Sequence, residues 1–135
     1  MPRLIDTSLW IDLTRARSPA ALKTFVTPYF NDPDACLAEP IVFELLRNAT
    51  DSEVNVLTQY FATLPILTSP TDLWGRAVQL GQECRKQGVT AASMDLLISS
   101  VAIFHGAELV TFDDDFQLIA HVSALQVRLL KRPVS

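Results

Sequence analysis

The sequence predicts an α/β fold, in which helices cover both faces of a central parallel sheet of about five short strands. Short apolar segments alternate with longer segments whose apolar residues have helical spacing. The chain has 135 residues, and we expect them to form a single domain over residues 1–135. With 49% hydrophobic and 19% charged residues, the composition supports a core and excludes disorder.

The first quarter of the chain predicts one strand and two helices. Residues 3–5 are a short apolar stretch, and Ser8 is placed to cap the helical turn that follows. Ser18 is placed to cap a helix over 20–30, because the proline after it is tolerated at a first helical position. Asparagine, aspartate and proline in 31–34 then end this helix.

The second quarter predicts two strands around two helices. Residues 35–38 form the second strand, and a proline opens the third helix, over 40–49. The fourth helix starts at Asp51, and its apolar residues repeat with helical spacing at Val54, Leu57, Phe61 and Leu64. Residues 65–68 form the third strand.

The rest of the chain predicts three helices and two strands. The fifth helix opens at 70–72 and stops at Gly88, because glycine commonly follows a helix end. Ser93 is placed to cap the sixth helix, which is apolar nearly all round over 94–104 and should be the most buried. The remaining elements are a fourth strand at 108–111, a short helix at 115–120 and a fifth strand at 126–130.

The alternation of short strands and helices has a consequence for function. It produces βαβ units and therefore a parallel sheet. In open parallel sheets, ligands bind beyond the carboxyl ends of the strands, so the residues just after each strand are the candidates for chemistry.

Several features of the sequence predict a cytoplasmic protein. Asp6 interrupts the apolar stretch that a signal peptide would need. The longest mostly apolar segment, 96–104, is far shorter than the roughly 18 residues of a membrane span. Cys36 and Cys84 have no disulfide or zinc-site spacing, and we interpret both as buried thiols in a reducing compartment.

Acidic residues lie near the predicted ligand-binding edge of the sheet. Asp6 directly follows the first strand, and Asp113 to Asp115 follow the fourth. Asp95 lies in the first turn of the very apolar sixth helix, and Glu44 lies on the flank of the apolar stripe of the third helix. Each acid alone has an ordinary explanation as a cap, a turn residue or a solvated side chain.

Together, four acids from distant parts of the chain predict a metal site. Two carboxylates about 4 Å apart repel by about 4 kcal/mol at an effective dielectric of about 20, so a converging set needs a cation. Oxygen ligands without histidine or thiolate suit Mg²⁺, with Mn²⁺ as a substitute. Ser8 and Thr111 add hydroxyls that either orient a carboxylate or act as ordinary caps.

Four motifs resemble, in order and spacing, those of PIN-domain ribonucleases, and they are most similar to the VapC-type toxins of toxin-antitoxin systems. The resemblance covers essentially the whole chain. The motifs are Asp6-Thr-Ser-Leu-Trp-Ile-Asp12, Glu44-Leu-Leu-Arg-Asn48, Asp95-Leu-Leu-Ile-Ser-Ser-Val-Ala102 and Leu109-Val-Thr-Phe-Asp-Asp-Asp-Phe116.

The resemblance implies which acids are catalytic and hold the metal. These are Asp6, Glu44, Asp95 and Asp113, with Asp115 as a second-rank metal ligand. Glu39 competes with Glu44, but it precedes the predicted helix, whereas the family's acid lies within it and precedes a leucine. Asp114 occupies a variable position of the motif and is not carried over.

The resemblance also implies an activity and partners. It implies a type II toxin of the VapBC kind, a Mg²⁺-dependent endoribonuclease that cleaves tRNA or ribosomal RNA by metal-activated water. It further implies a homodimer and a cognate antitoxin whose tail covers the site. Aromatic side chains early in the chain are candidates for an interface or for the core, namely Trp10, Phe25, Tyr29 and Phe30. Arg15, Arg17 and Arg47 are candidates for phosphate contacts or solubilising charges.

The net charge of −4, taken alone, disfavours a nucleic-acid partner. Setting the four predicted metal ligands aside brings the formal charge to zero, so the acidity belongs largely to the site.

Two other functions remain to be weighed. A catalytically inert PIN-like domain that binds protein would keep the fold without the metal. A receiver-type signalling domain would also be α/β, but it needs an acceptor aspartate after the third strand, where residues 65–70 offer none.

Overall fold

A computed structural model describes residues 1–133 and contains the expected five-stranded sheet, with every pair of neighbouring strands parallel. The strand order is β3-β2-β1-β4-β5, so β1 lies at the centre. The strands are β1 (Arg3–Ile5), β2 (Ala35–Ala38), β3 (Ile66–Leu67), β4 (Glu108–Thr111) and β5 (Gln126–Leu129). The α/β fold and the parallel sheet are therefore confirmed.

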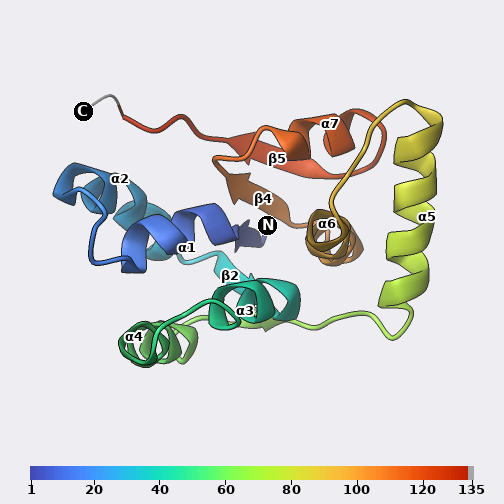
Figure 1. Ribbon diagram of the computed structural model, residues 1–135. Coiled ribbons are helices and arrows are strands. Elements are labelled where there is room, and N and C mark those ends of the chain that lie inside the picture. The colour runs from blue at the N-terminus through green and yellow to red at the C-terminus, as the bar shows by residue number, and fades with distance from the viewer. Residues whose placement is uncertain (134–135) are drawn as a thin grey trace.

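Seven helices within residues 1–133 surround the sheet. Helices α1 and α2 lie on one side of it, and α5 and α6 lie on the other, as Figure 1 shows. The helices are α1 (Thr7–Thr14), α2 (Ala20–Phe30), α3 (Glu39–Leu46), α4 (Asp51–Phe61), α5 (Leu73–Lys86), α6 (Ser93–His105) and α7 (Asp115–His121). The predicted helices on both faces are confirmed, with ends that differ by a few residues.

The strand register places the first candidate acid. Ile5 in β1 pairs with Val110 in β4, and the amide N–H of Asp6 donates to the Val110 carbonyl over 3.0 Å. Asp6 and Thr111 therefore leave the sheet side by side at the carboxyl edge of its two central strands. This is the edge at which α/β sheets bind ligands.

The three serine caps predicted from the sequence are wrong. The N-cap residues are Asp6 for α1, Pro19 for α2 and Ala92 for α6. Asp6 takes the role because it is the only residue between β1 and α1, so Ser8 already lies inside the helix. A capping box at Thr50 starts α4.

Helix α6 is buried along its middle. Residues 98–102 have at most 4% exposure, whereas Phe104 near the end of the helix is 46% exposed. The expectation of a deeply buried sixth helix is thus correct only for its centre. Cys36 and Cys84 are both free and buried, as expected.

The third strand is shorter than predicted. It pairs only Ile66 and Leu67 with β2 and lies at the edge of the sheet, where Ile66 is 49% exposed. No helix within residues 1–133 has the length and apolar character needed to cross a membrane.

A matched pair of glycine substitutions tests the helix ends. Gly106 ends α6 with φ of 61°, so Gly106→Ala should lower the free energy of unfolding by about 1 kcal/mol. Gly75 lies within α5, where an added Cβ meets nothing within 4 Å, so Gly75→Ala should raise it by about 0.5 kcal/mol. Urea unfolding measures both changes. If both variants raised, or both lowered, the free energy of unfolding, the backbone conformation assigned to one of the two glycines would be contradicted.

Candidate active site

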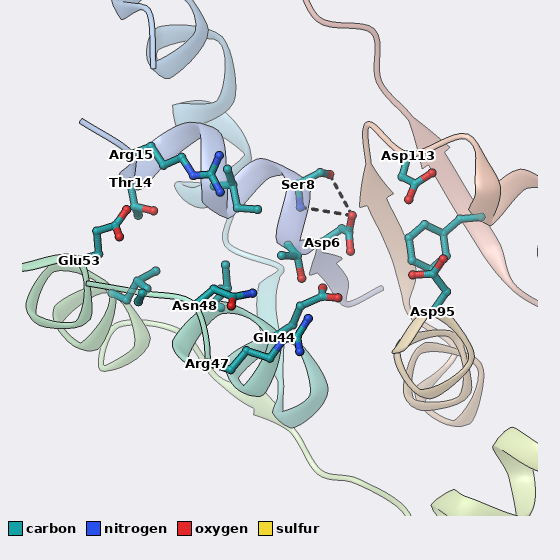
Figure 2. Close-up of a pocket in the computed structure, with 16 residues that line it drawn as sticks. Asp6, Ser8, Thr14, Arg15, Glu44, Arg47, Asn48, Glu53, Asp95 and Asp113 are labelled. Carbon is teal, nitrogen blue, oxygen red and sulfur yellow. Dashed lines mark hydrogen bonds between the residues drawn. The ribbon is translucent and has the colours of Figure 1, made fainter. Parts of the chain in front are cut away.

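The carboxylate of Asp6 is the most deeply buried acid of the site, with 4% exposure. Its Oδ2 accepts hydrogen bonds from the Thr111 hydroxyl at 2.7 Å and from the Ser8 hydroxyl at 2.9 Å. The Ser8 amide approaches the same oxygen at 3.4 Å, as the dashed lines in Figure 2 show for Ser8. Because all three donors contact one oxygen, the carboxylate is anchored and can offer its other oxygen to a ligand.

The same two hydroxyls hold the loop after β4. Ser8 Oγ accepts from the Phe112 amide at 3.1 Å, and Thr111 Oγ1 accepts from the Asp113 amide at 2.9 Å. Each hydroxyl therefore connects Asp6 to the segment that carries Asp113. Of the two functions weighed for these hydroxyls, orienting a carboxylate is the one that the contacts favour.

A cleft of about 360 Å³ opens at this edge of the sheet. The four acids predicted as catalytic all line it, and they come from the end of β1, from α3, from α6 and from the loop after β4: Asp6, Glu44, Asp95 and Asp113. Figure 2 shows Asp6 and Glu44 near one another and facing the side that carries Asp95 and Asp113. The structure thus brings together four residues that are far apart in the sequence.

Asp115, which the resemblance gave only as a secondary metal ligand, lies close to two of the four acids. One carboxylate oxygen from each of Asp95, Asp113 and Asp115 lies within 4.8 Å of the others. Asp115 is exposed, and its amide donates to Asp113 Oδ1 at 2.9 Å. These three acids form the tightest acidic group at the site.

The competing acid Glu39 lies elsewhere. It is exposed at the first position of α3 and accepts a hydrogen bond from the Ser69 hydroxyl at 2.8 Å. Glu39 lines a different hollow, together with Phe43 and Trp74. The geometry therefore favours Glu44 as the acid of the cleft.

Burial and like charges raise the pKa values of two acids. Burial raises the pKa of Asp6, and the hydrogen bonds from Thr111 and Ser8 oppose this rise. Burial raises the pKa of Asp95 to about 7, with further contributions from the charges of Asp113, Asp6, Glu44 and Asp115. A divalent cation would relieve this repulsion, and the all-oxygen donor set fits a hard ion.

Basic side chains also line the cleft. Arg15 and Arg47 reach it, whereas Arg17 lines a separate hollow. Of the early aromatic residues, Trp10 and Phe30 are buried in the core, with 0% and 8% exposure. Their rings meet edge to face at 4.7 Å.

An ion pair that the sequence did not predict connects α1 with the segment after β5. Arg132 Nε donates to Asp12 Oδ2 at 2.9 Å, and its guanidinium lies over the Phe112 ring at 4.3 Å. Asp12 is 8% exposed. The signal available in the sequence was a carboxylate between the apolar residues Ile11 and Leu13 of a helix without any other charged residue.

Comparison with known proteins decides the family. The family model of the PIN domain matches residues 3–122. The chain belongs to the PIN domain family. Ribonuclease VapC11 of Mycobacterium tuberculosis and a VapC ribonuclease of Mycobacterium bovis are each 34% identical to it over an alignment of 128 residues. Each alignment covers 91% of this chain and 95% of the relative. The protein is therefore a VapC-type member of the PIN family.

Solved structures with the same fold include VapBC proteins. VapBC2 from Rickettsia felis bound to a promoter DNA fragment has a TM-score of 0.77 at 18% identity, covering 97% of this chain and 100% of that chain. VapBC-1 from nontypeable Haemophilus influenzae has a TM-score of 0.72 at 19% identity, covering 96% and 98%. Several of these structures are toxin-antitoxin complexes.

The receiver-type alternative is wrong. The receiver fold has the strand order 2-1-3-4-5. The strand order observed in this PIN domain is β3-β2-β1-β4-β5.

Removing the Asp95 charge should stabilise the metal-free protein at high pH. Because its folded pKa of about 7 exceeds the unfolded value, stability falls as pH rises from about 4 through 7. Asp95→Asn should escape this loss. Its gain in unfolding free energy in EDTA should be about 1–2 kcal/mol larger at pH 8 than at pH 5, after allowance for solvent screening.

Asp114→Asn is the control, because Asp114 is exposed and lies outside the acidic group. It should change the unfolding free energy by less than about 0.5 kcal/mol at either pH. Equal gains for Asp95→Asn at pH 5 and pH 8 would contradict the raised pKa of Asp95.

Proposed function

We propose that this PIN protein is the toxin of a type II, VapBC-kind toxin-antitoxin system and works as a metal-dependent endoribonuclease. Residues 1–135 would act as one nuclease domain. The observation that carries the proposal is the convergence of Asp6, Glu44, Asp95 and Asp113 on one cleft. The names of the two VapC relatives, both ribonucleases, support RNA as the substrate.

The donor set fits Mg²⁺, with Mn²⁺ as a substitute. The ligands would be Asp6, Glu44, Asp95 and Asp113, and the position of Asp115 close to Asp95 and Asp113 gives it a place beside them. When bound, a divalent ion supplies Lewis acidity toward phosphate oxygens and lowers the pKa of water. Oxygen-only coordination is what these two ions prefer.

The protein's own residues prepare the site in two ways. Ser8 and Thr111 hold the Asp6 carboxylate in one orientation, so little reorganisation is needed when charge arrives. Asp95, with a pKa raised to about 7 by burial and by neighbouring acids, is only partly ionised near neutral pH, and a cation favours its ionised form. Cation binding and loss of the Asp95 proton are therefore linked.

We propose structured RNA, tRNA or ribosomal RNA, as the substrate class and the cytoplasm as the place of action. The two free thiols fit a reducing compartment. A cognate antitoxin is the proposed protein partner, with a tail that covers the acidic cleft. The similar toxin-antitoxin complexes support such a partner.

Cleavage of RNA by the purified protein tests the nuclease function. Total RNA and Mg²⁺ should give discrete fragments, and EDTA should abolish them. Asp6→Asn and Asp95→Asn should each lower the rate by about 100-fold or more, because each removes a ligand charge. Asp51→Asn, which changes an exposed acid of α4 that lines neither the cleft nor the hollow beside it, should cleave like wild type.

Equal cleavage by all four proteins would indicate a contaminating nuclease. No cleavage by any of them, together with no Mn²⁺ binding that depends on Asp6, would favour the inert protein-binding module. Each outcome contradicts the nuclease proposal.

Besides the complex with an antitoxin, we propose that the protein forms a homodimer. Trp74 and Phe43 are 73% and 58% exposed and line one apolar hollow with Met94 and Leu97. Large exposed aromatic residues in one hollow are typical of an interaction surface. The elements involved, α3, α5 and α6, place this surface away from the early aromatic residues.

Substitution at this hollow tests the dimer. Light scattering after gel filtration should give the mass of two chains for wild type. Trp74→Glu should weaken association by about 30-fold or more, because central tryptophans dominate such interfaces. Leu118→Glu is the control, since Leu118 is 47% exposed on α7. A monomeric wild type, or a dimeric Trp74→Glu, would contradict the proposal.

A further inference from the structure

The acidic cleft has a neighbouring hollow, and Asp113 contributes to the walls of both. The second hollow has a volume of about 570 Å³, and its walls are the loop after β4 and the segment after β5, with Lys131 and Arg132. We call the two neighbouring hollows together the trough, and Asp113 lies where they meet.

Positive side chains stand at both ends of this trough. Arg15 and Arg47 line the end formed by α1 and α3, and Lys131 lines the end formed by the segment after β5. Figure 2 shows Arg15 and Arg47 on the side of the cleft opposite Asp113. The acidic centre is therefore flanked by cations in both directions.

These three cations form no salt bridge inside the described fold, although the charge of Arg15 lowers the pKa of Glu53. The basic residues of 1–133 that form ion pairs are Arg3, Arg76, Lys86, Arg128 and Arg132. For Arg15, Arg47 and Lys131, no carboxylate oxygen of the described chain lies within 4 Å of the charged nitrogens. Unpaired cations that line a trough are available to an anionic ligand.

Two nearby groups have other roles. Glu53 also lines the cleft, but its Oε1 accepts from the Thr50 amide at 2.9 Å as part of the capping box of α4. Phe112 lines the second hollow, but Arg132 covers its ring. The trough therefore offers isolated cations without an open aromatic surface for base stacking.

We propose that a single RNA strand lies along this trough, with backbone phosphates on one side of Asp113 contacting Arg15 and Arg47 and phosphates on the other side contacting Lys131. The inference rests on the proposed ribonuclease function and extends it to the binding of the substrate. Phosphate contacts fix the register of a strand without reading its bases. The acids alone would repel a polyanion, so cations on both sides are needed to bring the bond to be cut over the metal ligands.

Binding without cleavage tests the path. In an Asp95→Asn background with Mg²⁺, fluorescence anisotropy gives the Kd of a labelled single-stranded RNA at several salt concentrations. Arg15→Gln, Arg47→Gln and Lys131→Gln should each weaken binding about fivefold at 100 mM salt. Each should also lower the slope of log K against log salt by about 0.7, the value for one phosphate contact of a single strand.

Arg85→Gln on α5 is the matched control, because Arg85 is exposed and lines neither hollow. It should leave the Kd and the slope unchanged. Circular dichroism and thermal unfolding show that each variant is folded. Unchanged slopes for the three trough variants, or an equal loss for Arg85→Gln, would overturn the inference.

Polyglutamate of similar length distinguishes phosphate from carboxylate ligands. RNA should bind at least tenfold more tightly, and equal binding that depends on the same three residues would overturn the assignment to RNA. Because binding is measured without cleavage, it is independent of the nuclease test. A protein that cleaves RNA while the three variants bind normally refutes only the path, and a protein that binds along the trough without cleaving refutes only the nuclease function.

Discussion

The buried carboxylate of Asp6 is the constraint on which the site depends. A charged group with so little exposure is stable only when it is hydrogen-bonded, and its donors come from two elements that lie far apart in the chain. Ser8 belongs to α1 and Thr111 to β4, and both hydroxyls also accept from the backbone of the loop after β4. One ionisable group thus holds the start of the first helix, the central strand and the loop with Asp113 in a single arrangement.

The rigid sheet allows the acids to be held against their mutual repulsion. Asp95 is carried by a helix whose middle is buried, and Asp6 follows the central strand, so neither side chain can withdraw without disturbing the core. The pKa of Asp95 is raised because its charged form is buried and is repelled by the neighbouring carboxylates. Sites that gather like charges in this way lower the stability of the free protein and favour the binding of a cation. Around the acids, which favour a cation, lie Arg15, Arg47 and Lys131, which favour an anionic ligand.

The strands and the helix end that the sequence predicted correctly depend on residues that are neighbours in the chain. The strands at Arg3–Ile5, Ala35–Ala38 and Glu108–Thr111 agree with their apolar segments, and Gly88 ends α5 with a positive φ. The serine caps failed because a cap is decided by where the chain leaves the preceding element. At Ser8 the helix had already begun, and the hydroxyl was left to bind Asp6. Glu44 could be preferred to Glu39 only through resemblance, and the fold then placed them on different hollows.

The sequence by itself determined the α/β class and the acids that follow the strands, because periodicity and strand ends are local properties of the chain. The tertiary structure decided the strand order, the approach of Asp115 to Asp95 and Asp113, and the ion pair of Arg132 with Asp12, which are 120 residues apart. It also decided which of the surface arginines line the acidic cleft. These relations depend on packing between distant segments, and no local pattern encodes which distant partner a side chain will meet.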